Sequence, residues 1–182
     1  MARGTSGRLH FIDRNNRKVS GFTLLELLIV IAVMTVLATA AAPSFSSLIE
    51  SNKVKRLATE IEWLLVQAKS EAVMRGQRVT VTPSDMATTY SGAENALSWS
   101  IEAKLSGGTV LGKISNSEFG SVKIYENFST LDFDPLTGRP NDDGHFGLYT
   151  DSSKIVKVTV RKMTGRLVSC SDGEAYGYTQ CP

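Results

Sequence analysis

The sequence is poor in the residues that most metal centres and hydrolytic triads require. Its 182 residues include only two histidines, and His10 lies in a basic N-terminal extension, which leaves His145 alone in the rest of the chain. One histidine excludes a His-rich metal centre and argues against a Ser-His-Asp triad. A Gly-rich phosphate loop followed by Lys and an H-E-x-x-H motif are also missing from the sequence. We therefore expect no catalytic residue, no metal and no cofactor, and we interpret His145 as a structural residue at the start of a strand.

Cysteine is equally scarce. Cys170 and Cys181 are too few for a structural zinc site and too far apart for a redox C-x-x-C motif. In an oxidising compartment they would close a short loop and stabilise the fold by about 2.5–3 kcal/mol in the chain-entropy model. In the cytosol they would be two free thiols. The export signal described below favours the disulfide.

The chain has no general excess of positive charge. Its net charge is +2, and the first 21 residues carry five basic side chains against one acid, which leaves −2 for the remainder. A slightly acidic remainder disfavours a generally cationic nucleic-acid-binding domain. With 42% hydrophobic and 21% charged residues, a disordered, collagen-like or polytopic membrane protein is also disfavoured.

One long hydrophobic run dominates the N-terminal part. Residues 22–42 contain a single charge, Glu26, and three threonines. As a helix this run would be about 31 Å long, enough to cross the hydrocarbon core of a bilayer. Basic residues come directly before it, so the positive-inside rule places residues 1–21 in the cytoplasm and the C-terminal part outside. We expect a single transmembrane helix over 22–42.

Two simple interpretations of this run are less satisfactory. Ala40-Ala41-Ala42 resembles a signal-peptidase site, but the run is longer than a usual signal peptide core, and Pro43 would follow the scissile bond. A plain membrane anchor leaves Glu26 unexplained, since a carboxylate costs about 2.5–3.5 kcal/mol at the centre of a membrane helix and less near its end. A partner for Glu26 is the better explanation.

The residues Gly21-Phe22-Thr23-Leu24-Leu25-Glu26, followed by the apolar run, resemble the class III signal of type IV pilin-like proteins. The resemblance implies that a prepilin peptidase cuts between Gly21 and Phe22 and that the new N-terminus at Phe22 is methylated. It also implies that Glu26 pairs with the N-terminal amine of a neighbouring subunit during assembly. A buried carboxylate beside a buried ammonium offsets much of the desolvation of both groups.

Beyond the run, Pro43 and Ser44 predict a break or bend. An amphipathic helix is expected over 43–75, followed by a C-cap at Gly76. Its predicted buried face follows the i, i+3, i+4, i+7 spacing and consists of Leu57, Ile61, Leu64, Leu65, Ala68 and Ala72. A helical stretch from residue 22 to 75 would be about 80 Å long if continuous. Such a length suits a filament subunit better than a small isolated domain.

Residues 76–182 are predicted to form a β-rich periplasmic head, because the apolar periodicity switches to two after Gly76. The predicted strands are 78–82, 98–104, 109–114, 121–125, 130–134, 146–150, 155–160 and 166–169. A polar loop is expected over 83–97, a hairpin turn at Gly107-Gly108 and a turn-rich connection over 135–144. The alternation indicates an antiparallel sheet with one face covered by the amphipathic helix. The fold class is therefore α+β, and the resemblance implies a pilin-like plan.

The head carries further family features. The pattern F-x-P-x-x-G-R at Phe133, Pro135, Gly138 and Arg139, and a late strand pair around Thr164-Gly165-Arg166, resemble the FimT/FimU/GspH group. That group contains minor type IV pilins and the minor pseudopilin of type II secretion. The resemblance implies a minor subunit of a pilus initiation or tip complex, or alternatively a secretion pseudopilin. Its partners would be prepilin peptidase, other major and minor pilins or pseudopilins, and the inner membrane. A C-terminal disulfide loop is more typical of the pilin members.

Two surface features of the head carry residue types that occur in binding sites. Asp132, Asp134 and residues 141–143 offer oxygen ligands of the kind calcium prefers, but the spacing lacks an EF-hand core and Leu136 occupies a ligand position. We interpret this loop as a solvated turn with Asx caps.

Some FimT proteins are proposed DNA receptors with a G-R-x-R motif, which here reads Gly165-Arg166-Leu167-Val168. Arg161 and Lys162 would replace the missing second arginine, because phosphate contacts require positive charge. Otherwise these cations protect a strand edge from pairing. Tyr176 and Tyr178 would stack on bases, but packing on the sheet or on a neighbouring subunit is the favoured interpretation.

Overall fold

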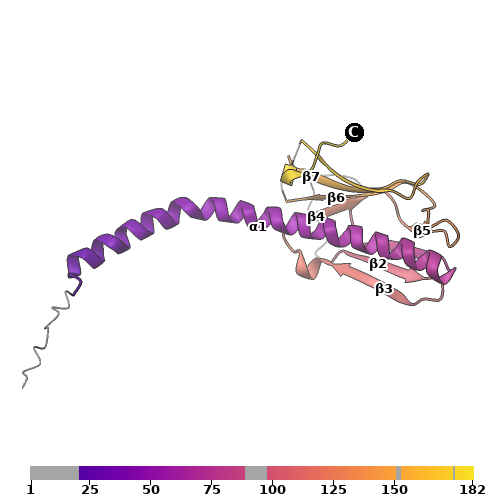
Figure 1. Cartoon of the computed structure of the whole chain (residues 1–182), viewed down its shortest axis with the longest axis horizontal. Helices are drawn as coiled ribbons and strands as arrows, with labels where there is room; N and C mark the ends of the chain where they lie inside the picture. The colour runs from indigo at the N-terminus through magenta and orange to yellow at the C-terminus, as the bar shows by residue number, and fades with distance from the viewer. Residues whose placement is uncertain (1–20, 89–97, 151–152, 174) are drawn as a thin grey trace, which may run out of the picture. The chain divides into compact units, whose positions relative to one another are not determined.

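The computed structural model describes residues 21–88, 98–150, 153–173 and 175–182, and the side chains of 40–44 lie outside this description. The chain divides into two compact units, 1–42 and 43–182. Its helix α1 (Leu24–Arg75) begins in the first unit and ends in the second (Figure 1). The helix assignment continues through Pro43, so of the predicted break or bend the break is wrong, and the single long helix expected from residue 22 to 75 is confirmed, with its start at Leu24. A proline removes only one i→i−4 hydrogen bond, and the alanines that precede it have the highest helix propensity of any residue.

The second part of α1, residues 43–75, has the predicted buried face. All six predicted residues are at most 5% exposed, and Val54 and Ala58, which the sequence analysis omitted, complete the face. The helix ends at Arg75 and is followed by Gly76, whose φ of +61° is readily adopted only by glycine. The N–H groups of Gly76 and Gln77 donate to Val73 O and Ala72 O at 3.3 and 3.2 Å. This arrangement confirms the predicted C-cap.

The head contains two antiparallel sheets where the sequence analysis expected one. Sheet A has the order β3-β2-β1-β5, formed by β1 (Val79–Ser84), β2 (Ser100–Leu105), β3 (Val110–Ser115) and β5 (Leu131–Phe133). Sheet B has the order β4-β6-β7-β8, formed by β4 (Lys123–Glu126), β6 (Gly144–Tyr149), β7 (Ile155–Val160) and β8 (Leu167–Asp172). The 3₁₀ turns are η1 (Asn116–Glu118) and η2 (Ala175–Gly177).

The eight predicted strands are all present, with ends that differ by up to three residues. Alternation shows which side chains are buried, but it does not show which strands pair. Here β4 pairs with β6, whereas β5 returns to pair with β1, and this exchange divides the strands between two sheets. The Gly107-Gly108 turn between β2 and β3 is confirmed by a bond from Gly108 N–H to Leu105 O at 2.8 Å.

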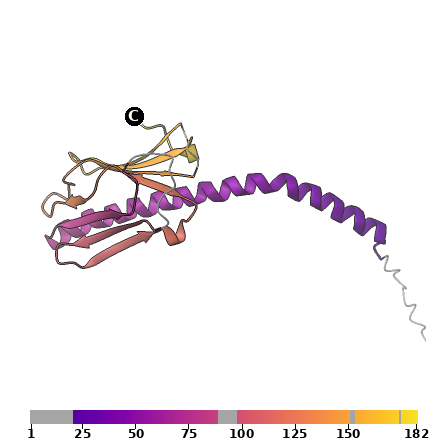
Figure 2. The same cartoon turned by 180° about the vertical axis from the view of Figure 1, so that it is seen from behind.

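The second part of α1 lies between the two sheets and contributes to the core of both (Figures 1 and 2). Leu57, Ile61 and Leu65 are at most 1% exposed, and they belong to one cluster with Val81 of sheet A and Leu148 of sheet B. Burial of one such aliphatic side chain stabilises the fold by about 1.5–3 kcal/mol. The helix is therefore the central layer of the head.

Candidate functional site

The predicted processing site lies just outside α1. Residues 21–23 are non-helical, and Phe22 is 77% exposed. A Cβ built on Gly21 would meet nothing within 4 Å. The peptide bond between Gly21 and Phe22 is thus accessible and is not held in a helical turn. Both features suit a bond that a peptidase must reach.

Thr23 fixes where the helix begins, a role that the sequence analysis did not assign. Its Oγ1 accepts a hydrogen bond from the Glu26 N–H at 3.2 Å, which is the N-cap arrangement. The sequence signal was present, because Thr23-Leu24-Leu25-Glu26 fits the S/T-x-x-E capping pattern. As a result Phe22 lies before the helix and Glu26 lies in its first turn.

The N-terminal part of α1, residues 24–39, is apolar on all sides apart from Glu26. The hydroxyl groups of its threonines donate hydrogen bonds to backbone carbonyl groups of the same helix. Thr35 and Thr39 donate to Ala32 O and Val36 O, each at 2.8 Å. Among the described residues, Glu26 forms no ion pair. Large hydrophobic side chains over residues 22–37 are each at least 39% exposed, and they are Phe22, Leu24, Leu25, Leu27, Leu28, Ile29, Val30, Ile31, Val33, Met34, Val36 and Leu37. A helix that is hydrophobic all round is typically buried in protein or membrane.

Within the described residues, no helix has the length and apolar character of a membrane span. The predicted transmembrane segment over 22–42 therefore stays a prediction.

The predicted cationic residues flank the turn between β7 and β8. The backbone of Arg161 bonds to that of Arg166 at 3.0 Å, and Gly165, with φ +62°, closes the turn. Both arginines are exposed and line a groove of about 390 Å³, together with Thr164 and the C-terminal Pro182. Lys162 is not part of this lining, and its backbone N–H donates to Asp143 Oδ1 at 2.6 Å. The structure thus brings Arg161 and Arg166 together without Lys162.

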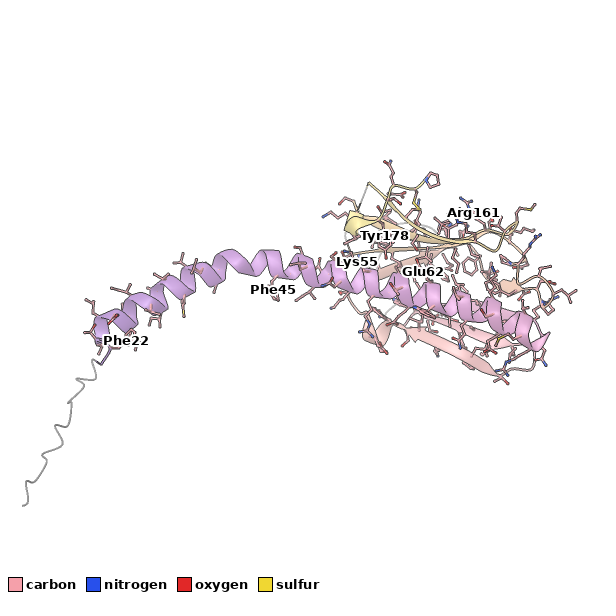
Figure 3. The ribbon with its side chains drawn as sticks, viewed as in Figure 1. Phe22, Phe45, Lys55, Glu62, Arg161 and Tyr178 are labelled. Carbon is pink, nitrogen blue, oxygen red and sulfur yellow. A yellow bond between two sulfur atoms is a disulfide. The ribbon has the colours of Figure 1, made fainter. Side chains whose placement is uncertain are left out.

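The two tyrosines proposed to stack on bases pack against the head. Tyr176 and Tyr178 lie against the main core cluster, and the Tyr176 hydroxyl shares a 2.8 Å hydrogen bond with Thr150 Oγ1. Burial, and then the negative charge of Glu62, raise the pKa of Tyr178. Tyr178 is labelled near Lys55 and Glu62 on α1, with Arg161 further along sheet B (Figure 3). Packing on the sheet is therefore what the structure shows for these rings.

The predicted disulfide between Cys170 and Cys181 is present. The segment that it closes runs back along β8, where Ser171 N–H donates to Thr179 O at 2.8 Å and Cys181 N–H donates to Ser171 O at 3.1 Å. The disulfide therefore holds the end of the chain against the edge of sheet B.

The acidic loop has the hydrogen bonds of a capped turn. Asp134 Oδ1 accepts from the backbone N–H groups of Leu136 and Thr137 at 3.0 and 2.8 Å. The bond from the Thr137 N–H is the main reason that the pKa of Asp134 is lowered. Asn141 Oδ1 accepts from Asp132 N–H at 2.9 Å. Among the described residues, no group of three or more His, Cys, Asp or Glu side chains is arranged to hold a metal ion.

His145 occupies a structural position at the start of β6. Its N–H donates to Asn127 Oδ1 at 2.7 Å, and its ring meets the Tyr125 ring edge-on at 5.9 Å between centroids. Burial, followed by the positive charge of Lys157, lowers the pKa of His145. Both effects favour the neutral form of the imidazole.

An N-terminal apolar helix that begins beside an accessible Gly-Phe bond and continues into a two-sheet head defines a pilin-like subunit. Residues 16–42 match the prokaryotic N-terminal methylation motif, and residues 57–164 match the family described as type II transport protein GspH. The chain belongs to the GspH family, which confirms the expected resemblance to the FimT/FimU/GspH group.

Individual relatives are more distant. Two fimbrial proteins of Pseudomonas aeruginosa are each 36% identical over 67 residues, which is 36% of this chain and 43% of theirs. The chain thus spans less than half the length of these relatives. Two crystal structures of the type IV minor pilin FimU from Pseudomonas aeruginosa align with 63% and 64% of this chain and with 90% and 87% of theirs. Their sequence identities are 16% and 18%, with TM-scores of 0.45 and 0.47.

Proposed function

We propose that this chain is a minor pilin that is incorporated into the initiation or tip complex of a type IV pilus. In this proposal prepilin peptidase removes residues 1–21 and methylates the amine of Phe22. Before assembly the segment 22–42 holds the precursor in the inner membrane, with its head in the periplasm. The action of the protein is assembly, and it requires no catalytic residue.

The observation that carries the proposal is the isolation of Glu26 in an apolar helix. The hydroxyl groups of Thr23, Thr35 and Thr39 all have partners within their own helix. The Glu26 carboxylate is the charge for which the described part of this helix provides no counterion. The amine of a processed Phe22 on a neighbouring subunit has the required charge, and the pairing offsets the desolvation of both groups. The pair would fix the axial register between two subunits.

Deletion of the gene, with a complemented control, tests the choice of filament. Loss of surface pili in sheared preparations, restored by complementation, is the expected result. Intact pili together with a block in exoprotein release would assign the chain to a type II secretion pseudopilus instead. The family match to a type II transport protein makes this the principal alternative.

A second candidate function is DNA capture, and the groove shared by Arg161 and Arg166 favours it. Two adjacent guanidinium groups would contact neighbouring phosphates of a DNA backbone. Replacing both arginines by alanine should reduce, by about two, the slope of the logarithm of the DNA-binding constant against the logarithm of salt concentration. Lys162→Ala is the matched control, because it removes one positive charge next to the groove. Equal effects of Lys162→Ala and the arginine substitutions would contradict a site in the groove.

A further inference from the structure

Three of the four sheet edges are covered by the chain's own backbone. The covering segments are 139–141 along β5, residue 87 along β4 and 179–181 along β8. At the contacted positions these bonds occupy backbone groups that an additional strand would use. The bonds are Asp134 N–H to Arg139 O at 2.9 Å, Asn141 N–H to Asp132 O at 2.8 Å, Glu126 N–H to Ala87 O at 3.0 Å, Ser171 N–H to Thr179 O at 2.8 Å and Cys181 N–H to Ser171 O at 3.1 Å.

The fourth edge, β3, has no such cover among the described residues. Asn116 N–H donates to Trp99 O at 3.0 Å, which sets the alternation of the β2–β3 ladder. Because alternate residues of an antiparallel strand face its partner, Ile114 faces β2, whereas Lys113 and Ser115 direct their N–H and C=O groups outward. The described contact on this side comes from a side chain of α1, Gln67 Nε2, which donates to Leu111 O at 3.5 Å.

A groove of about 520 Å³ runs between this open edge and α1. Its walls include Trp63 and Val66, which are 69% and 42% exposed, and its base includes Leu64 and Ile114. Gly112 allows the close approach of strand and helix, because a Cβ built there would lie 2.7 Å from Leu64 Cδ1. An exposed tryptophan beside unpaired backbone groups provides both parts of a strand-binding site, namely hydrogen bonds and an apolar pocket.

We propose that the β3 edge binds an extended segment of another polypeptide as a fifth strand of sheet A. Lys113 and Ser115 provide the backbone hydrogen bonds. Every second side chain of the added strand enters the groove against Trp63 and Val66. The side chains of the added strand that face the groove are apolar.

Charge adds a further requirement on the bound segment. Lys113 lies on the edge strand β3, opposite Glu102 of β2. Glu102 pairs with Lys104 at 2.8 Å. Glu60, on the helix wall of the groove, shares Arg56 with Glu118, at 2.9 and 3.0 Å. Lys113 is the basic side chain of the groove lining and forms no ion pair among the described residues, so it favours an acidic residue in the bound segment.

A second copy of this chain is a poor source of the strand. Its other three edges are already contacted by its own backbone, so β3 is the edge that it would offer, and two β3 edges would form a closed twofold pair that cannot continue a filament. The partner is thus a different subunit. This step rests on the proposed filament function, whereas the strand-binding site itself does not.

Site-specific photo-crosslinking in cells tests the proposal. The full-length chain carries benzoylphenylalanine at position 66, and the crosslinked peptides from sheared filaments are identified by mass spectrometry. The expected crosslink joins position 66 to an extended segment of a different subunit. A crosslink to a helix, a crosslink to a second copy, or the absence of any crosslink from filaments that contain the chain would overturn the proposal.

Two variants of Lys113 isolate the backbone contribution. Lys113→Pro removes an outward N–H that the β2–β3 ladder does not use, a position where an edge strand tolerates proline. Lys113→Ala removes only the charge. Relative to Lys113→Ala, Lys113→Pro should lower the crosslink yield by about tenfold, as expected from the loss of one backbone hydrogen bond and the added bulk of the ring. Equal yields in the two variants would contradict strand addition.

A second pair of variants tests strand addition at the β3 edge if the Lys113→Pro variant does not fold. Trp63→Glu changes an exposed side chain in the groove, and Leu136→Glu makes a similar change at a residue that is 87% exposed outside it. Only Trp63→Glu should abolish the crosslink, and equal yields would overturn the proposal. Absence of the unlabelled chain from filaments would instead contradict the proposed function, which keeps the two failures distinguishable.

Discussion

The ring of Tyr125 lies directly over Gly147, its partner across the β4–β6 pair. A Cβ built on Gly147 would be 2.1 Å from Tyr125 Cε1 and 2.2 Å from Cζ. The same tyrosine contacts the rings of His145 and Tyr149, so it is held from several sides. Sheet B thus depends on the absence of a side chain at position 147.

We predict that Gly147→Ala destabilises the protein by about 1–3 kcal/mol, the usual cost of overpacking a well-packed site. Urea unfolding of the purified chain measures this change. Gly107→Ala is the matched control, because a Cβ at Gly107 meets nothing within 4 Å and its φ is not in the left-handed region. Equal stability of the two variants would show that Tyr125 moves aside without cost.

Glu126 should make stability depend on pH. Burial raises its pKa from 4.5 to about 6, and its Oε2 has no hydrogen-bond partner among the described residues. The folded state therefore holds this proton more tightly than the unfolded state, and the contribution of Glu126 to stability falls as the pH rises from about 4.5 to 6. The loss is about 2 kcal/mol and persists at higher pH.

Glu126→Gln should remove that part of the pH dependence. The measurement is the free energy of unfolding of the variant and the parent chain at pH 4.5 and pH 7. The variant should gain stability relative to the parent at the higher pH, because its neutral side chain carries no desolvation penalty. A constant difference between the two proteins would contradict the raised pKa.

Loss of the Cys170–Cys181 disulfide should cost about 2–3 kcal/mol, because the short loop restricts the unfolded chain. The double variant Cys170→Ala/Cys181→Ala and the reduced parent chain should lose similar amounts in urea unfolding. Reductant added to the double variant is the control and should have no effect. A stable parent chain under reducing conditions would indicate that the backbone contacts of residues 179–181 are sufficient alone.

Gly21→Leu should leave the precursor uncut, because the added side chain occupies the position that the peptidase recognises before the scissile bond. Immunoblots of membrane fractions should then show only the longer form. A mature-sized band would place the cleavage site elsewhere.

Glu26→Ala should be cut normally but incorporated poorly into filaments, since the variant cannot pair with the amine of a neighbouring subunit. The ratio of the chain in sheared filaments to the chain in membranes measures this effect. Glu26→Asp is the matched control that keeps the charge, and it should retain part of the incorporation. Incorporation of Glu26→Ala at the parent level would refute the register role.

Local signals in the sequence were sufficient for much of the fold. The buried face of α1, the cap at Gly76 and the eight strands depend on neighbours a few residues apart, where helical and extended periodicities are distinct. The pairing of Cys170 with Cys181 also needed only their proximity and an export signal. At Pro43 the sequence left a break or a bend open within the predicted helix, because a proline usually interrupts a helix, whereas the alanines before it favour continuation.

Long-range pairing was not accessible from the sequence. The return of β5 to β1 is set by side-chain packing between segments 50 residues apart (Val81 and Leu131), and a period of two is the same in either sheet. The backbone N–H of Lys162 is held by Asp143, which a different loop provides. Of the three predicted cations, Arg161 and Arg166 line the groove and Lys162 does not.

The position of β5 also determines how much of the chain the folding of sheet A requires. β1 becomes an interior strand only when β5 pairs with it, and β4, which precedes β5 in the chain, belongs to sheet B. Sheet A therefore cannot be completed until the chain is available as far as Phe133. Until then β1 presents an open edge, although β1, β2 and β3 follow one another in the sequence.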